Sequence, residues 1–148
     1  NVTRMEFMFS GAYSFNQPIG TWDVSMVNSM EAMFSCGVTT KYTSGKISLG
    51  FDTELNFNQP IGGWDISNVK NMTLMFAGAS SFNQDISSWN VSNVTKMRGM
   101  FYDASSFNQS LDSWGTSEKY THYYSSYYKY EFSGNTPNWT LPKPMFKN

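Results

Sequence analysis

The side chains that could carry out nucleophilic or acid–base chemistry are few in this sequence. His122 is the only histidine and Cys36 the only cysteine. His122 stands in a Tyr-rich segment, so a Ser–His–Asp or Cys–His arrangement would have to pass through that segment. The sequence also lacks the HExxH, paired CxxC, EF-hand and phosphate-binding Gly-loop motifs. We therefore expect no catalytic residues, no cofactor and no enzyme activity.

Two acidic side chains are candidate calcium ligands. Asp23 and Asp65 each follow a tryptophan, and paired carboxylates can hold Ca²⁺. Asn90 and Gly115 occupy the equivalent places further along the chain, so the carboxylates do not continue. We interpret the two acids as solvated surface groups and expect no metal site.

Several asparagines lie in Asn-x-Ser/Thr sequons, which accept N-linked glycans in secreted eukaryotic proteins. These glycosylation candidates are Asn1, Asn71, Asn90, Asn93, Asn108 and Asn138. We predict an N-glycoprotein, with glycans on some of them, if the source is eukaryotic. The competing explanation is structural, because Ser-Asn-Val-Thr also suits the capping of a helix start.

A 25-residue repeat must position all of these side chains. Trp64, Trp89 and Trp114 are evenly spaced at this period, and Met-Phe pairs and Phe-Asn-Gln recur in the same phase. Phe34 and Phe57 lie much further apart in the sequence than the equivalent Phe76 and Phe82, so one copy carries an insertion. Such self-similarity is typical of stacked architectures.

The two halves of each copy have different apolar periods. One half places apolar side chains on a single helical face, as Val94, Met97, Met100, Phe101 and Ala104. In the other half Trp89 and Val91 alternate with polar neighbours, which favours a short half-buried strand. We therefore expect an α/β fold: a leucine-rich-repeat-like right-handed solenoid of about four to five coils, each a short helix plus a short parallel strand.

Stacking of these coils predicts columns of equivalent side chains, because one coil cannot bury its own apolar face. The expected structural columns are Asn16, Asn58, Asn83 and Asn108, and Trp22, Trp64, Trp89 and Trp114. Each amide could bond the next amide or satisfy the backbone of a turn. We predict a structural role for both columns.

The consensus MF-x-x-A-x-x-FNQ-x-I-x-x-W-x-V-S-N-V resembles the 25-residue repeat of BspA-like leucine-rich-repeat surface proteins, including surface lipoproteins. The match covers about residues 1–114. The resemblance implies an extracellular or cell-surface location and a role in adhesion or partner binding, without catalytic residues. The chain departs from the pattern at the insertion and after Trp114.

Two segments outside the regular copies are candidate contact surfaces. We expect 1–114 to be the repeat solenoid, with an inserted hairpin at about 35–55, and 115–148 to be a degenerate last coil, a Tyr-rich segment and a Pro-containing cap or tail. The hairpin is either a contact element or a tolerated surface excursion, and the Tyr-rich segment is either a capping helix or an aromatic contact surface. The interaction candidates are Tyr42, Ile47, Tyr120, Tyr124, Tyr127 and Tyr128. Beside the insertion, Cys36 is interpreted as a structural thiol, with an intermolecular disulfide as the alternative.

The composition narrows the class of partner. A net charge of −1 and 14% charged residues do not suit a nucleic-acid-binding surface, and no apolar run approaches the ~18 residues that span a bilayer. Asn1 is neither an initiator Met nor followed by a signal peptide, which suggests a processed chain or a fragment. We expect a non-catalytic structural protein that self-assembles end to end into a filament or surface layer, or else an adhesion module for a surface protein or glycan.

Overall fold

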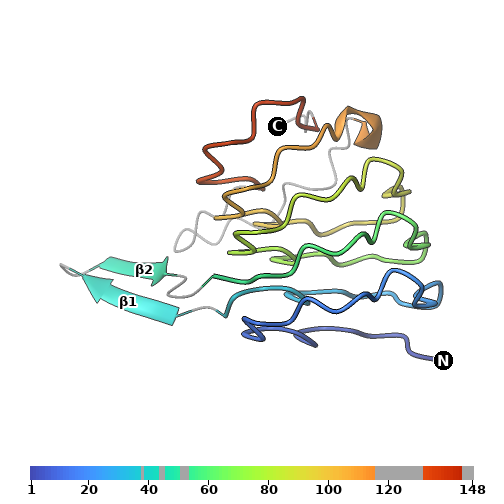
Figure 1. The fold of residues 1–148 in the computed structure, drawn as a ribbon, viewed down its shortest axis with the longest axis horizontal. Coiled ribbons are helices and arrows are strands. Elements are labelled where there is room, and N and C mark those ends of the chain that lie inside the picture. Colours follow the sequence, from blue (N-terminus) through green and yellow to red (C-terminus); the bar gives the residue numbers. More distant parts are fainter. Residues whose placement is uncertain (38, 44–45, 51–53, 116–131, 145–148) are drawn as a thin grey trace.

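The computed structural model describes residues 1–37, 39–43, 46–50, 54–115 and 132–144. The chain winds through coils that stack one above the other, from its first residues to the segment 132–144 (Figure 1). The regular elements are strands β1 (Thr39–Thr43) and β2 (Lys46–Gly50) and the short 3-10 helix η1 (Asp112–Trp114). The coils themselves are built from turns.

The expected α/β solenoid of helix-plus-strand coils is wrong. The described residues contain no α-helix, and the only named strands are those of the β1–β2 pair. Neighbouring coils are joined instead by isolated parallel bridges, which pair Arg4 with Ser29, Ser29 with Asn71, and Asn71 with Lys96. These bridges lie in the half of the repeat that we expected to be helical. The leucine-rich-repeat solenoid is therefore replaced by a stack of irregular coils.

A left-handed residue in each coil explains why no helix forms. The backbone angle φ is 57° at Phe7, 51° at Ala32, 56° at Leu74 and 59° at Gly99, which are equivalent positions in successive coils. A right-handed helix needs φ near −60° at every residue. One left-handed residue therefore ends any helix that begins before it.

The backbone hydrogen bonds of this half alternate between two directions. Within one coil, the Met75 and Ala77 N–H groups donate to the carbonyls of Met72 and Leu74, three residues earlier. The intervening N–H group of Phe76 donates to a carbonyl of the next coil. An α-helix would direct all of these N–H groups four residues back along the same segment. Half of the backbone donors thus hold neighbouring coils together.

The bonds between coils join into continuous lines of peptide groups. In one line, each donor after the first belongs to the same peptide group as a carbonyl that accepts a bond from the previous coil. Its N–H···O distances are all 2.9 Å: Phe9 to Met33, Phe34 to Met75, Phe76 to Met100, and Phe101 to Phe132. A second line runs Gly11 to Ser35, Cys36 to Ala77, Gly78 to Tyr102, and Asp103 to Gly134. We call these the Phe9 line and the Gly11 line. Hydrogen bonds in such lines polarise and strengthen one another.

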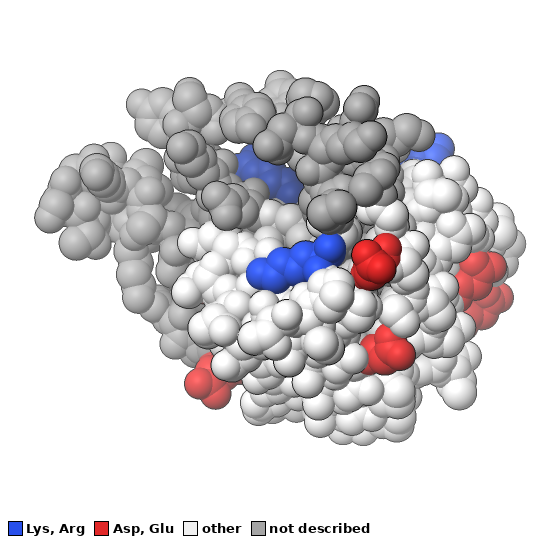
Figure 2. Space-filling view, turned by 90° about the horizontal axis from the view of Figure 1, so that it is seen from above, with Lys and Arg blue, Asp and Glu red and all other residues white. Residues whose placement is uncertain are grey.

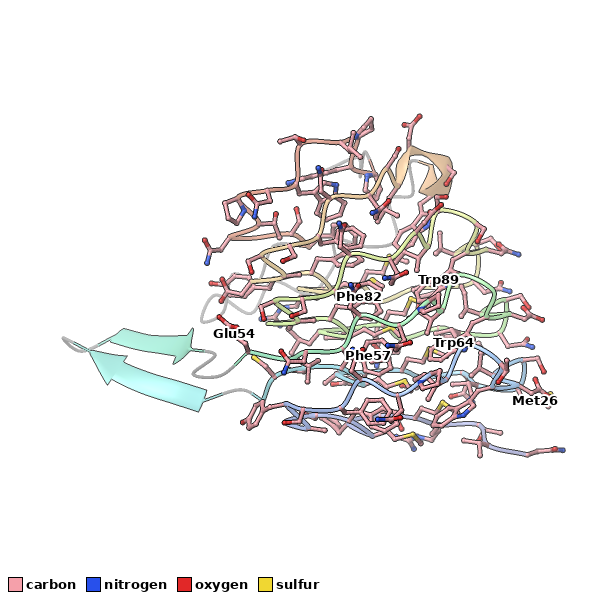
Figure 3. The ribbon with its side chains drawn as sticks, in the orientation of Figure 1. Met26, Glu54, Phe57, Trp64, Phe82 and Trp89 are labelled. Carbon is pink, nitrogen blue, oxygen red and sulfur yellow. The ribbon has the colours of Figure 1, made fainter. Side chains whose placement is uncertain are left out.

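Aromatic rings fill the core of the stack. Phe76 stacks on Phe82 of its own coil with ring centroids 4.1 Å apart, and on Phe34 and Phe101 of the neighbouring coils at 5.7 and 5.5 Å. Figure 3 shows successive members of these columns, Phe57 with Phe82 and Trp64 with Trp89. The five side chains that we expected on a helical face, from Val94 to Ala104, are all buried. Their burial was thus predicted correctly although their backbone conformation was not.

The insertion contains an antiparallel hairpin that projects from the side of the stack (Figure 1). Strands β1 and β2 pair in a register that places Tyr42 opposite Ile47. The side chains of both residues lie outside what the structure describes. The Tyr-rich segment, with His122 and the candidates Tyr120, Tyr124, Tyr127 and Tyr128, also lies outside the described residues.

The segment 132–144 covers the coil that precedes it. Trp139 packs edge-on against Phe107, with ring centroids 4.7 Å apart and an interplanar angle of 81°. Its indole N–H donates to the Gln109 carbonyl at 3.0 Å. This coil therefore continues the stack with a different packing of its aromatic ring.

The left-handed conformation at Leu74 predicts an unusual order of stability. A left-handed φ costs a residue with a Cβ about 1–2 kcal/mol, a cost that glycine does not have. We expect the Leu74→Gly chain to be more stable than the Leu74→Ala chain by about 1 kcal/mol, as measured by urea unfolding. Both variants lose the leucine side chain, so their difference reports the backbone. If the Leu74→Ala chain is as stable as the Leu74→Gly chain or more stable, the backbone at residue 74 is not left-handed.

Candidate functional site

The column of asparagines is a ladder that fixes successive turns. The Asn16 Oδ1 atom accepts from the backbone N–H of Asn58 at 2.9 Å and from the Gln59 side-chain amide at 3.0 Å. Asn83 donates in the same way to Asn58, and Asn108 to Asn83. The Oδ1 atoms of these side chains hold the coils in register.

The tryptophans form a second column with a repeated bond. The indole N–H of Trp64 donates to the Ile19 carbonyl of the preceding coil at 3.1 Å, and Trp89 and Trp114 bond preceding coils in the same way. Trp22 belongs to the first described coil and has no acceptor among the described residues. It is 39% exposed, whereas Trp64 is 4% exposed.

Most of the exposed large apolar side chains belong to the first coil. Among the described residues, six of the seven exposed large hydrophobic side chains lie in this coil, and Leu141 is the other. The six are Val2, Phe7, Met8, Tyr13, Trp22 and Met26. We call this surface the first-coil face. Figure 3 shows Met26 at the side of the stack. The positions equivalent to Met8 in the next coils, Met33 and Met75, are fully buried.

The first-coil face also carries a row of backbone acceptors. The carbonyls of Arg4, Glu6, Met8 and Ser10 are equivalent to carbonyls that accept bonds from a preceding coil elsewhere in the stack. Within the described part of the chain they accept no hydrogen bond. The Phe9 line begins at the Met8 carbonyl and the Gly11 line at the Ser10 carbonyl. Within the described residues, the first coil therefore combines exposed apolar side chains with a row of backbone carbonyls that accept no hydrogen bond.

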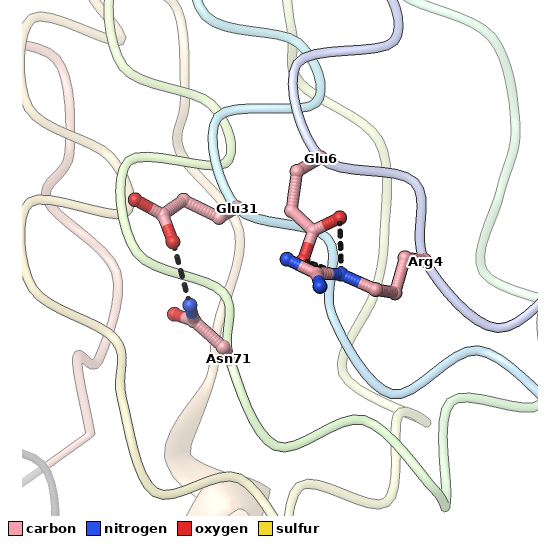
Figure 4. Close-up of polar contacts among 4 residues, drawn as sticks. All are labelled: Arg4, Glu6, Glu31 and Asn71. Carbon is pink, nitrogen blue, oxygen red and sulfur yellow. Dashed lines mark hydrogen bonds and ion pairs between the residues drawn. The ribbon is translucent and has the colours of Figure 1, made fainter.

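Two carboxylates of the first two coils have polar partners (Figure 4). The Arg4 guanidinium lies 2.8 Å from the Glu6 carboxylate, and the Asn71 amide donates to Glu31 at 2.8 Å. An exposed ion pair of this kind contributes about 0–1 kcal/mol. Figure 2 shows the opposite end of the stack, where the charged side chains of the described residues are few and dispersed.

The sequons differ in whether the side-chain nitrogen is already bonded. The Nδ2 groups of Asn71, Asn93 and Asn138 donate to Glu31, to the Ser67 carbonyl and to the Ser105 carbonyl. A glycan attaches at Nδ2, so modification would remove these bonds between coils. At Asn90, Oδ1 accepts from the Ser92 N–H, and Nδ2 has no partner among the described residues. Glycosylation stays a prediction, and the geometry favours Asn1, Asn90 and Asn108.

The two aspartates beside the tryptophan column are exposed and accept bonds from serine. The pKa of Asp65 lies below its usual value because the Ser67 hydroxyl and backbone N–H bond to the carboxylate, while the nearby Asp23 charge opposes this slightly. The pKa of Asp23 is lowered by Ser25 in the same way. In the described ranges no group of three or more His, Cys, Asp or Glu side chains could hold a metal ion.

The serine bonds give a testable pH dependence. Since the folded pKa of Asp65 is lowered, these bonds stabilise the fold above the usual pKa and are lost as pH falls through the lower, folded value. We expect Ser67→Ala to raise the pKa of Asp65 toward its ordinary value and to leave that of Asp23 nearly unchanged. Carboxyl chemical shifts in an NMR titration measure both. Equal shifts at the two aspartates would contradict this explanation.

Cys36 is buried within the second coil, and its thiol contacts the Gly37 carbonyl at 3.9 Å. Burial keeps the sulfur away from a second molecule, which favours the structural thiol over the intermolecular disulfide. No helix among the described residues is long and apolar enough to cross a membrane.

Comparison with known proteins gives one family. A family model described as "Mycoplasma protein of unknown function, DUF285" matches residues 1–48 and 39–139. The chain belongs to the DUF285 family. The two matched segments of this DUF285 protein overlap in the hairpin insertion. No curated protein and no solved structure matches the chain. The family match does not confirm the finer resemblance to BspA-like surface proteins.

Proposed function

We propose that this DUF285 protein is a non-catalytic extracellular or cell-surface protein that assembles end to end through its first-coil face. The observation that carries the proposal is the concentration of six exposed apolar side chains on that one coil. Solvent-exposed apolar patches on soluble proteins usually mark interaction sites.

The energetics favour a polypeptide partner on this face. Burial of a large apolar side chain stabilises a contact by about 1.5–3 kcal/mol relative to full exposure. A partner with backbone N–H groups would also satisfy the carbonyl row from Arg4 to Ser10, as strand addition does at the edge of a sheet. A small ligand or a glycan would leave most of these acceptors unpaired.

The surface location is supported by the resemblance to BspA-like surface proteins. The consensus with its recurring Met-Phe, Phe-Asn-Gln and tryptophan positions extends over most of the described chain. A low content of charged residues, 14%, suits a protein that packs against copies of itself.

The test is the association state of the purified chain, followed by sedimentation velocity over a wide concentration range. We expect the chain to associate, and Phe7→Asp to weaken this association at least tenfold. Aspartate tolerates the left-handed conformation of Phe7, so the fold should be retained.

The matched control is Asn90→Asp. It adds the same charge on the side of the stack, at the position that Asp23 and Asp65 occupy in other coils. We expect it to associate as the unmodified chain does. A chain that stays monomeric at all concentrations, or that associates equally well with Phe7→Asp, would reject the proposal.

A second candidate function is adhesion through the hairpin. Strands β1 and β2 project from the stack and pair only with each other among the described strands. A projecting hairpin is accessible to a surface protein or glycan on another cell. Replacement of residues 39–50 by a short Gly-Ser linker should abolish cell binding without changing self-association if adhesion is the function.

A further inference from the structure

We propose that the Phe-Asn-Gln turns, on the side of the stack, form a contact surface that pairs with the same surface of a second copy of this chain. The surface is a row of side-chain amides, which we call the amide row. It consists of Asn16, Asn58, Asn83 and Asn108, each with the glutamine that follows it. Figure 3 labels Phe57 and Phe82, which directly precede two of these asparagines. The amide row is separate from the first-coil face, so this inference goes beyond the proposed function and does not depend on it.

Each asparagine of the row has an unused donor. The Asn58 Oδ1 atom accepts from the backbone N–H of Asn83 and from the side-chain amide of Gln84, both at 2.9 Å. Because a backbone N–H can only donate, the atom that it contacts must be the oxygen, and the position of Nδ2 is fixed as well. The Oδ1 atoms of Asn16, Asn83 and Asn108 accept bonds in the same way. In the described part of the chain, none of the four Nδ2 groups has an acceptor.

Each glutamine of the row has an unused acceptor. The Gln84 Nε2 group donates to the Asn58 side-chain oxygen at 2.9 Å and to the Asn58 backbone carbonyl at 3.0 Å, so both of its hydrogens are used. Gln109 bonds Asn83 identically, and no donor reaches the Oε1 atom of either glutamine within the described ranges. The described side-chain atoms that are buried without a hydrogen bond are three serine hydroxyls, so the free amide atoms reach solvent. Each coil therefore presents one donor and one acceptor in fixed orientations.

The surroundings of the row allow a second molecule to approach closely. The residues directly after the four glutamines are Pro18, Pro60, Asp85 and Ser110, and those directly before the four phenylalanines are serines or an asparagine. Asp85 is the only charged residue in these two sets. A contact on this side of the stack therefore buries little charge, which would be costly without a counterion.

The repeat distance of the row favours a second copy as the partner. Parallel bridges join the coils, for example between Asn71 and Lys96, which sets their spacing at about 4.8 Å. An extended peptide along the row would present the groups of one side only about every 6.6 Å, so it would be out of register at the next coil. A second stack has the same spacing at every level, and it carries the same donor and acceptor.

The order of the two amides determines the orientation of the pair. The chain runs from asparagine to glutamine in every coil, and a two-fold axis parallel to the stack reverses this order in the second copy. The Asn58 Nδ2 donor then lies opposite the Oε1 acceptor of the second copy's Gln59, and the reverse pair forms by symmetry. Two antiparallel stacks would instead set asparagine against asparagine, whose Oδ1 atoms already accept two bonds. The parallel pair also places Asp85 opposite Ser81 and not opposite another carboxylate.

The experiment changes one free donor and leaves the ladder intact. Asn58→Asp retains the Oδ1 acceptor that Asn83 and Gln84 use, and it replaces the free Nδ2 donor by a charged oxygen. The matched control is Asn90→Asp, because Oδ1 of Asn90 also accepts a backbone N–H. Both substitutions are made in the full-length Phe7→Asp chain, in which the end-to-end contact is weakened. Near-ultraviolet circular dichroism checks the fold, and sedimentation velocity measures association.

We expect the Phe7→Asp chain to form a dimer and nothing larger at high concentration. Asn58→Asp should raise the dissociation constant of this dimer by about tenfold or more, because a carboxylate then faces an acceptor, and Asn90→Asp should leave it unchanged. A second measurement needs no substitution in the row. Nuclear magnetic resonance of the side-chain amides should show concentration-dependent shifts at Asn58 and Asn83 and none at Asn90.

A Phe7→Asp chain that stays monomeric, or whose dimer is equally strong with Asn58→Asp, would overturn the amide-row inference. The proposed function would stand in that case if the unmodified chain still forms longer species that Phe7→Asp removes. Amide resonances of the row that move only when an N-acetylglucosamine oligomer is added would assign the row to a glycan and would also overturn the inference.

Discussion

Replacement of Phe76 by Ala is expected to destabilise the protein by about 3–5 kcal/mol, the range for a large-to-small change in a packed core. Phe76 is fully buried and stacks on rings of its own coil and of both neighbouring coils. Its removal leaves a cavity between three coils. The backbone bonds of the Phe9 line prevent those coils from moving together to fill it.

The matched control for this prediction is Phe7→Ala. Phe7 is 57% exposed and lies in the first coil, so its loss creates no internal cavity. We expect its free energy of unfolding to change by no more than about 0.5 kcal/mol, the usual range for a surface substitution. Chemical denaturation of both variants measures the difference. Similar losses for the two phenylalanines would contradict the stacked core.

Replacement of Gly62 by Ala is expected to push two coils apart. A Cβ atom at Gly62 would lie 2.5 Å from the Asp85 carbonyl oxygen of the next coil, and Gly20 faces Pro60 in the same way at 2.4 Å. Both obstacles are backbone atoms, which cannot rotate out of the way as a side chain can. Overpacking of this kind costs about 1–3 kcal/mol. We expect a lower denaturation midpoint.

The adjacent glycine provides the control. A Cβ atom at Gly63 would meet nothing within 4 Å. Gly63→Ala should therefore leave the midpoint nearly unchanged or raise it slightly, since alanine restricts the unfolded chain. Neighbouring glycines with opposite responses would identify the close approach of coils as the cause. Equal responses at 62 and 63 would show that the coils are not packed as described.

Sequence reasoning located the buried side chains because spacing alone identifies them. Val94, Met97, Met100 and Phe101 are buried in the structure as the 25-residue pattern requires. The same spacing fits a helix and a chain of three-residue turns equally well. What decides between them is the left-handed backbone at non-glycine residues such as Leu74, for which residue type gives no signal. The helix-plus-strand coil was wrong for that reason.

The candidate site was only partly visible in the sequence. The repeat predicted the asparagine and tryptophan columns, but nothing in the residue types singled out the exposed Phe7, Met8 and Trp22. The row of carbonyl acceptors could not be inferred, because the direction of a backbone group depends on which neighbour its N–H bonds. The donor and acceptor of each such bond lie a full repeat or more apart in the sequence. The amino-acid composition therefore does not predict which groups pair.

The unidirectional hydrogen-bond lines give the stack a dipole along its long axis. Each peptide group in the Phe9 and Gly11 lines points its oxygen toward the first coil and its N–H toward the last. Aligned peptide dipoles add, as they do in an α-helix, where the amino-terminal end is positive. Here the sense is reversed, so the end that contains Asn1 carries partial negative charge and the end that contains Asn135 carries partial positive charge. Two such stacks in a common orientation attract along their axis before any side chain makes contact.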